Sequence, residues 1–362
     1  GTSVEAQNFS VISSTPRDPN RQGRTSTHRQ LSGVVAHLSP CVVELVEGAG
    51  YVAEEHDVTT EDGYILSIHR IPGGPKSPVS RGKQPVVLIH GLFAASDIWV
   101  LRGPEHDLAY QLVDHGYDVW ALNSRGNYYG KRHKYLSTSE PSFWRFSWHE
   151  FGTYDTAASI DYILSVTGMP RVSLVGHSMG GTVELVLLST RPEYNERVNV
   201  ALTFAPVVLF THALRGPIVR FGIRYGKQIE VSPKDPRNSR QVICMIDDPQ
   251  SMLPRLVKHY PQGTSVETLQ HYRQIAMSGK FQQYDFGPTS NYLRYKSFAS
   301  PEYPLENITA PVVLYYGPND PYTTKKVKDV LPVLKLLYDD AIELLNEHRD
   351  AESNGLRSDA FS

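Results

Sequence analysis

The sequence predicts an α/β protein with a mostly parallel, doubly wound sheet. Between residues 85 and 204, short β-branched runs alternate with helical segments, a pattern typical of βαβ units. The run Pro85–Ile89 is apolar throughout, as expected for a parallel strand that is buried on both faces. With 362 residues, the chain is long enough for one large α/β domain that carries an insertion.

The elements follow in chain order. Residues 53–60 and 65–71 have strand composition and flank an Asp-Gly turn, which predicts a β-hairpin. Apolar runs predict the next strands, and helical periodicity predicts the helices between them. We expect strands at 85–89, 117–122, 171–175, 198–204 and 311–316, and helices at 108–113, 154–166, 183–189, 323–331 and behind Pro332.

The predicted core is interrupted once. Residues 1–38 are rich in Ser, Thr and Arg and predict a flexible N-terminal arm. We assign residues 39–206 and 310–347 to the α/β core. Residues 207–309 break the strand-helix rhythm with many Pro, Gly and Tyr residues, and we interpret them as an inserted cap. Residues 348–362 form a polar tail.

Composition excludes several classes of protein. The 36 basic and 38 acidic side chains give a formal charge of -2, so we expect no nucleic-acid partner. The longest apolar stretch, at 198–210, is too short for a transmembrane segment. Cys41 and Cys244 are too few for a cysteine-rich metal site, and one bridge or two free thiols both remain open. We expect no metal and no cofactor. The first residues are polar, so we expect that any signal peptide was removed or not included.

The segment Gly176–Gly180 fits the G-x-S-x-G nucleophile elbow, in which a strand turns sharply into a helix and exposes a serine. A predicted strand precedes the motif and a predicted helix follows it. These neighbours favour a nucleophile, Ser178, over a structural turn without chemistry.

Acyl transfer requires hydrogen-bond donors at the oxyanion that forms during attack. The backbone N–H of Met179, directly after the serine, is one predicted donor. His90-Gly91 follows the strand at 85–89, and the next residue, Leu92, is the predicted second donor. Taken alone, Gly91 is better explained as a glycine that ends a strand, but together with the elbow motif it favours an oxyanion loop.

A serine nucleophile also needs a base and an acid that orients it, and in this type of fold the acid and then the base follow the serine in the chain. Asp320 ends the tight loop after the strand at 311–316 and is the predicted acid, although a turn aspartate is the alternative. Only His348 follows it, at the far end of the last helix. We expect His348 to be largely exposed and on the order of 15 Å or more from Ser178, so the base is unassigned.

These residues together resemble the acid lipase family of α/β-hydrolases, which includes gastric, lysosomal and insect lipases. The similarity is closest over residues 50–210 and resumes after 261. It rests on segments 54–64, 90–92, 116–120, 123–127, 143–150, 176–180, 261–265, 278–281, 284–287, 301–303, 307–309 and 314–317.

The resemblance implies an α/β-hydrolase fold and a secreted or lysosomal serine hydrolase of neutral lipid esters, triacylglycerols or steryl esters, which acts at a lipid-water interface without a cofactor. It implies that Ser178 and Asp320 are catalytic and that Leu92 and Met179 form the oxyanion hole. Glycosylation acceptor patterns occur at Asn8 and Asn307.

The sequence departs from the family pattern in three ways. Met179 replaces a glutamine, which leaves the backbone donor in place. The cap is short between residues 210 and 261. The Asn-His-x-Asp-Phe segment that carries the family's catalytic histidine has no counterpart after Pro332. A lipid-binding homologue without activity, or a variant transcript that lacks one exon, is therefore the alternative function, and resequencing across Pro332 separates the two. A peptidase on the same fold is a third reading.

Overall fold

The computed structural model describes residues 41–208, 259–315 and 340–349. The predicted arm, the acid candidate Asp320, Cys244 and the predicted helix at 323–331 lie outside these residues. Cys41, just before the first described helix, is a half-buried free cysteine.

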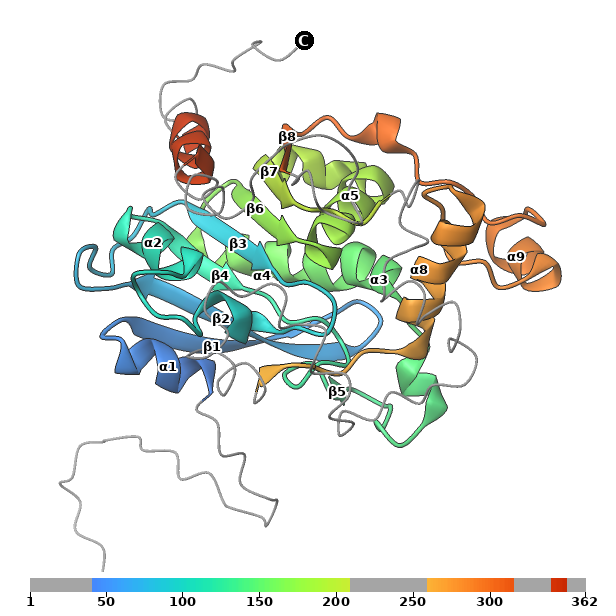
Figure 1. Ribbon diagram of the computed structural model, residues 1–362, viewed down its shortest axis with the longest axis horizontal. Coiled ribbons are helices and arrows are strands. Elements are labelled where there is room, and N and C mark those ends of the chain that lie inside the picture. The colour runs from blue at the N-terminus through green and yellow to red at the C-terminus, as the bar shows by residue number, and fades with distance from the viewer. Residues whose placement is uncertain (1–40, 209–258, 316–339, 350–362) are drawn as a thin grey trace, which may run out of the picture. The chain divides into compact units, whose positions relative to one another are not determined.

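One mixed sheet of eight strands organises the described residues (Figure 1). Its order is β1-β2-β4-β3-β6-β7-β8, and β5 pairs with β2. Strands β4, β3, β6, β7 and β8 run parallel, whereas β1, β2 and β4 pair antiparallel. The predicted α/β class is therefore confirmed. The strands are β1 (Val52–Thr59), β2 (Tyr64–Gly73), β3 (Pro85–Ile89), β4 (Asp118–Ala121), β5 (Arg132–His133), β6 (Val172–His177), β7 (Val198–Phe204) and β8 (Val312–Tyr315).

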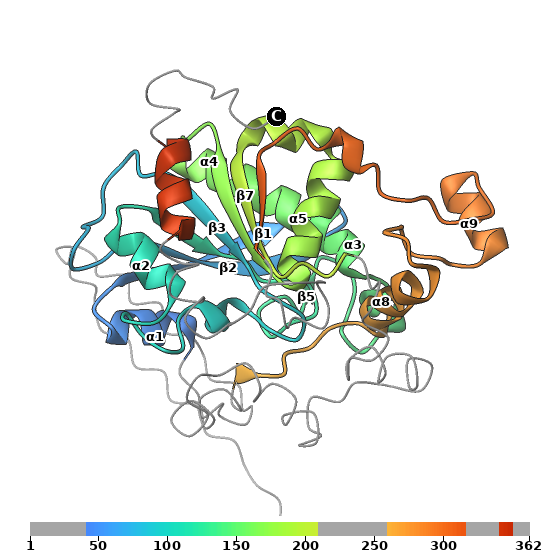
Figure 2. The same cartoon turned by 45° about the horizontal axis from the view of Figure 1, so that its top comes forward.

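Both faces of the parallel strands β4, β3, β6 and β7 are buried. In β3, Val86 and Leu88 face one apolar layer, while Val87 and Ile89 face the other, as the two-residue period of a strand requires. Helices α1 (Val42–Gly48) and α2 (Leu108–Asp114) and the helix at 340–349 cover the first layer (Figure 2). The second layer is covered by α3 (Trp148–Glu150), α4 (Ala157–Thr167) and α5 (Met179–Thr190). Short helical turns are η1 (Ser96–Trp99), η2 (Pro141–Trp144), η3 (Phe151–Thr156) and η4 (Pro192–Arg197).

Most of the elements predicted within the described residues are confirmed, and several differ. The predicted helix at 154–166 begins as a π-helical turn, η3, in which the Thr156 hydroxyl donates to the Phe151 carbonyl at 2.8 Å. Apolar periodicity does not reveal such a turn. Helices α1 and α3, strand β5 and the short turns η1, η2 and η4 were not predicted, nor were the helices of the cap described below.

Part of the predicted cap is described. It contains α8 (Val266–Ser278), α9 (Pro288–Tyr295) and η8 (Leu305–Asn307). Helix α8 is fixed to the core through His271, whose ring stacks on Trp148 at a centroid distance of 3.7 Å. His271 Nδ1 also lies 2.9 Å from the Ser147 hydroxyl. The cap domain boundaries remain a prediction, but α8 packs directly on the α/β core.

The helix at 340–349 contacts the amino-terminal edge of the sheet. Asn346 accepts a 2.7 Å hydrogen bond from the hydroxyl of Tyr117, which directly precedes β4, and Arg349 lies over the same ring. Ser178 follows the opposite, carboxyl end of β6, so the expected separation of His348 from Ser178 agrees with this placement. The expectation that His348 is largely exposed is wrong: packing half-buries it, and this burial lowers the pKa of its imidazole.

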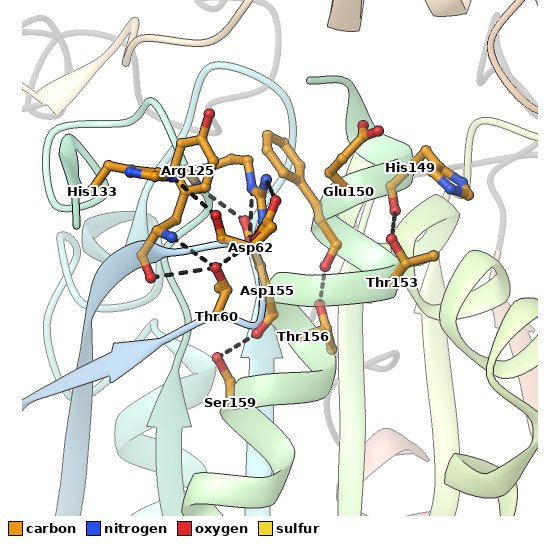
Figure 3. A network of polar contacts seen from close by, with 12 residues as sticks. Thr60, Asp62, Arg125, His133, His149, Glu150, Thr153, Asp155, Thr156 and Ser159 are labelled. Carbon is orange, nitrogen blue, oxygen red and sulfur yellow. Dashed lines mark hydrogen bonds and ion pairs between the residues drawn. The ribbon is translucent and has the colours of Figure 1, made fainter. Parts of the chain in front are cut away.

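A buried arginine joins two loops and the helical turn η3 at the carboxyl-terminal edge of the sheet. Arg125, after β4, binds Asp155 of η3 and Asp62 of the β1–β2 turn (Figure 3). The arginine side chain is 1% exposed, and its guanidinium carbon lies 3.9 Å from the centre of the Tyr64 ring. A buried ion pair with Asp155, a partly exposed ion pair with Asp62 and a cation–π contact thus hold the loop after β4 against η3 and the β1–β2 turn.

We predict that Arg125→Met lowers the free energy of unfolding by about 3–5 kcal/mol, because it leaves two carboxylates without their cation. Arg132→Met is the matched control. Arg132 pairs with Asp57 where both side chains are about half exposed, 49% and 51%, so its loss should cost less than about 1 kcal/mol. Urea unfolding of both variants measures the difference, and equal losses would contradict the assignment.

Candidate active site

The turn between β6 and α5 places Ser178 at the carboxyl edge of the parallel strands. Its backbone has φ 55° and ψ −113°, a strained conformation for a residue other than glycine. The Ser178 N–H donates to the Phe204 carbonyl at 2.8 Å, which ties the turn to the end of β7. The predicted sharp strand-to-helix turn at Ser178 is confirmed.

This turn requires glycine at three positions, because the neighbouring atoms leave no space for a side chain there. A Cβ atom on Gly180 would lie 2.2 Å from the Ile89 carbonyl oxygen, and one on Gly181 would lie 2.3 Å from the Thr203 methyl carbon. At Gly176, a Cβ atom would meet the Glu184 carboxyl carbon at 2.7 Å. The backbone of helix α5 therefore lies directly against the Ile89 carbonyl at the end of β3 and the Thr203 side chain near the end of β7.

The loop after β3 lies against the serine. A Cβ atom on Gly91 would lie 3.3 Å from Ser178 Cβ, so the chain passes the serine directly before Leu92. Met179 is buried at the first position of α5. The structure thus brings the chain segments of both predicted oxyanion donors to Ser178, while the predicted acid, Asp320, lies outside the described residues.

His90 supports this loop as a neutral imidazole. Its Nε2 lies 3.2 Å from the Ser124 backbone nitrogen, which can only donate, so Nε2 accepts and the proton is on Nδ1. Nδ1 then donates to the Gly91 carbonyl at 2.8 Å. Burial lowers the pKa of His90 to about 4. Both ring nitrogens form hydrogen bonds to the chain, so His90 orients the backbone before Leu92.

Strained backbone marks the ends of three neighbouring parallel strands. Phe93, Ser178 and Ala205 have φ values of 59°, 55° and 48°, and they follow β3, β6 and β7. Strained backbone conformations are found most often at functional sites, where the surrounding contacts stabilise them. Sequence analysis identified only Ser178, because its motif is specific. Phe93 and Ala205 carry no comparable sequence signal.

Comparisons with known proteins agree with this geometry. A family model described as a partial alpha/beta-hydrolase lipase region matches residues 42–103, and one described as the alpha/beta hydrolase fold matches residues 84–205. Lipase 3 of Drosophila melanogaster is 38% identical over 332 residues, which cover 82% of this chain and 84% of that protein. Human gastric triacylglycerol lipase is 35% identical over 309 residues, covering 77% and 78%.

The chain belongs to the acid lipase family. It is therefore a member of a family of carboxylic ester hydrolases with the α/β-hydrolase fold, as the sequence motifs predicted. Within residues 41–208, 259–315 and 340–349, no helix is long and apolar enough to cross a bilayer.

One buried acidic residue of this acid lipase homologue lies next to the turn at Ser178, where its carboxyl group contacts Gly176. Glu184, on α5, is completely buried. The Thr203 hydroxyl donates to its Oε2 at 2.7 Å, and none of the described residues forms a hydrogen bond with its Oε1. Burial raises the pKa of this carboxyl to about 8, so it is neutral at acidic pH. Sequence analysis missed Glu184, since its burial depends on packing of α5 against β7.

Glu184 predicts a pH-dependent stability. Its pKa is 4.5 when unfolded and about 8 when folded, so its neutral form favours the fold fully below pH 4.5, and this contribution is lost as pH rises toward 8. We predict that Glu184→Gln raises the free energy of unfolding at pH 8 by on the order of 3 kcal/mol and leaves it unchanged near pH 4.

Urea unfolding at both pH values measures this effect. Glu196→Gln, on the exposed side of η4, is the matched control and should change stability little at either pH. The same gain for Glu184→Gln at pH 4 and pH 8 would show that ionisation of Glu184 is not its cause.

Proposed function

We propose that the protein hydrolyses neutral lipid esters, triacylglycerols or steryl esters, with Ser178 as the nucleophile. The observation that carries this proposal is the strained turn at Ser178, at the amino end of α5, with the Gly91–Leu92 loop packed against it. Family membership supports the same chemistry, since the relatives include proteins named as triacylglycerol lipases.

The reaction follows from the roles of these residues. The Ser178 hydroxyl attacks the ester carbonyl carbon while a histidine base takes its proton, and Asp320 orients that base. The N–H groups of Leu92 and Met179 stabilise the oxyanion, assisted by the amino terminus of α5. The alkoxide leaves with the proton from the base, and water then releases the fatty acid from the acyl-enzyme.

The base is the incomplete part of this proposal. His348 lies on the helix that contacts the amino-terminal edge of the sheet, and the family's histidine segment has no counterpart. Without one triad member, a serine hydrolase retains only about 10³- to 10⁴-fold acceleration over water. We therefore expect slow hydrolysis. The alternative is a lipid-binding homologue without activity or an exon-skipped variant.

We also propose that the protein is secreted or lysosomal and glycosylated. The acceptor Asn307 is exposed on η8, and its side-chain nitrogen, which would carry the glycan, donates to the Ser189 carbonyl at 3.0 Å. The other acceptor pattern, at Asn8, lies outside the described residues.

Helix α9 provides a surface for contact with emulsified lipid. Tyr292, Leu293 and Phe298 are 50%, 69% and 67% exposed, and the two aromatic rings stack at 5.0 Å. Arg294 and Lys296 lie between them in sequence. An exposed apolar group flanked by cations is typical of segments that bind a lipid-water interface and its negatively charged fatty-acid products.

The nucleophile is tested by Ser178→Ala. Hydrolysis of emulsified triolein and cholesteryl oleate, measured by fatty-acid release, should be slow in the wild-type chain and should disappear in this variant. His348→Ala should leave the rate unchanged. Hydrolysis that survives Ser178→Ala would refute the proposed nucleophile, and rapid hydrolysis lost in His348→Ala would assign the base to His348.

The interface is tested by Leu293→Asp. A charge on this exposed side chain should lower hydrolysis of emulsified triolein at least about 5-fold by weakening contact with the lipid surface. Hydrolysis of soluble p-nitrophenyl butyrate should stay constant. Tyr135→Asp is the control, since Tyr135 is 85% exposed but outside α9. Equal effects of Leu293→Asp on both substrates would contradict an interfacial role.

A further inference from the structure

We infer that residues 259–262 of the cap clamp the oxyanion loop, and that Tyr260 is a positioning residue for the Leu92 N–H. This inference rests on the proposed ester hydrolysis. It connects the cap to the reaction itself, in addition to any role of the cap in covering the substrate.

The contacts form a continuous series along the loop after β3. The Gly91 carbonyl accepts from His90 Nδ1 at 2.8 Å, within the loop itself. The next carbonyl, of Leu92, accepts from the Tyr260 hydroxyl at 2.9 Å. The carbonyl after that, of Phe93, accepts from the Gln262 N–H at 2.7 Å. Two of three consecutive carbonyls are therefore held from the cap.

These contacts fix the direction of one N–H group. The Leu92 N–H shares a rigid peptide plane with the Gly91 carbonyl and points the opposite way. The Leu92 carbonyl belongs to the next plane along the chain. When His90 holds the first plane and Tyr260 holds the second, both backbone dihedral angles of Leu92 are determined. Its N–H is then preorganised for a developing oxyanion.

Strain explains why the loop needs a clamp. Phe93 has φ 59°, a conformation that costs free energy for a side chain of its size. The contacts of Tyr260 and Gln262 lie on either side of this residue, at the carbonyls of Leu92 and Phe93. Without them, relaxation of Phe93 would rotate the adjoining peptide and displace Leu92.

The clamp is itself firmly attached to the core. His259 Nδ1 lies 2.5 Å from Asp97 Oδ2, and the two side chains are only 8% and 5% exposed. The Gln262 side chain donates to the His259 carbonyl at 2.7 Å and accepts from the Tyr128 N–H at 3.3 Å. The segment therefore acts as a rigid support, joined to η1 and to the loop after β4.

Tyr260→Phe tests the clamp, because it removes only the hydroxyl. With p-nitrophenyl butyrate, we expect kcat to fall about 10-fold while KM changes less than about 2-fold, since displacing an oxyanion donor weakens transition-state binding selectively. Tyr135→Phe is the matched control for loss of an exposed hydroxyl and should leave both constants unchanged.

Hydrogen exchange gives a readout that does not depend on activity. The amides of Ala94 and Gln262 are hydrogen bonded to the carbonyls of Gly91 and Phe93. In Tyr260→Phe their exchange should accelerate about 10-fold, while amides of β3 stay unchanged. Asp97→Asn, which weakens the attachment of the clamp at His259, should accelerate the same two amides.

The outcomes separate the clamp from the proposed function. Unchanged exchange at Ala94 and Gln262 in both variants would overturn the clamp, as would a Tyr260→Phe enzyme whose loss is in KM alone. If the wild-type chain hydrolyses no ester, the proposed function fails, and the exchange rates still decide whether the cap holds this loop.

Discussion

Contact between the backbone of α5 and the ends of β3 and β7 is the constraint on which the candidate site depends. Side chains at Gly176, Gly180 and Gly181 would push the helix away from the sheet. The helix terminus, the serine and the loop after β3 would then no longer meet. The site therefore depends on three positions that carry no side chain. The apolar layers on both sides of the sheet hold the elements at this close distance.

The carboxyl edge of the parallel strands carries several features that lower the stability of the fold. Strained backbone at Phe93, Ser178 and Ala205 and the buried carboxyl of Glu184 each cost stability. The strained residues follow the strand ends, whereas the centres of β3 and β7 are apolar. The apolar centre of the sheet offsets the cost of these features at the candidate site.

Sequence reasoning succeeded where a signal is local. A short segment is enough to predict the strands at 85–89 and 198–204, from their β-branched residues, and the turn at 62–63, from its Asp-Gly pair. The elbow motif is equally local, because it combines glycines with a flanking strand and helix. It failed where structure depends on distant partners. The half-buried state of His348 results from packing against elements far apart in the chain, and apolar periodicity does not distinguish the π-helical turn at 151–156 from an α-helix. No local pattern encodes them.

The pairing of β7 with β8 has a consequence for synthesis on the ribosome. Phe204 ends β7 and pairs with Tyr315, so more than one hundred residues must be translated before this edge of the sheet is covered. At about 5–20 residues per second, the nascent chain exposes an apolar strand edge for roughly 5–20 s. Unpaired edges recruit other chains, so a truncated product that ends in the cap would be prone to aggregation.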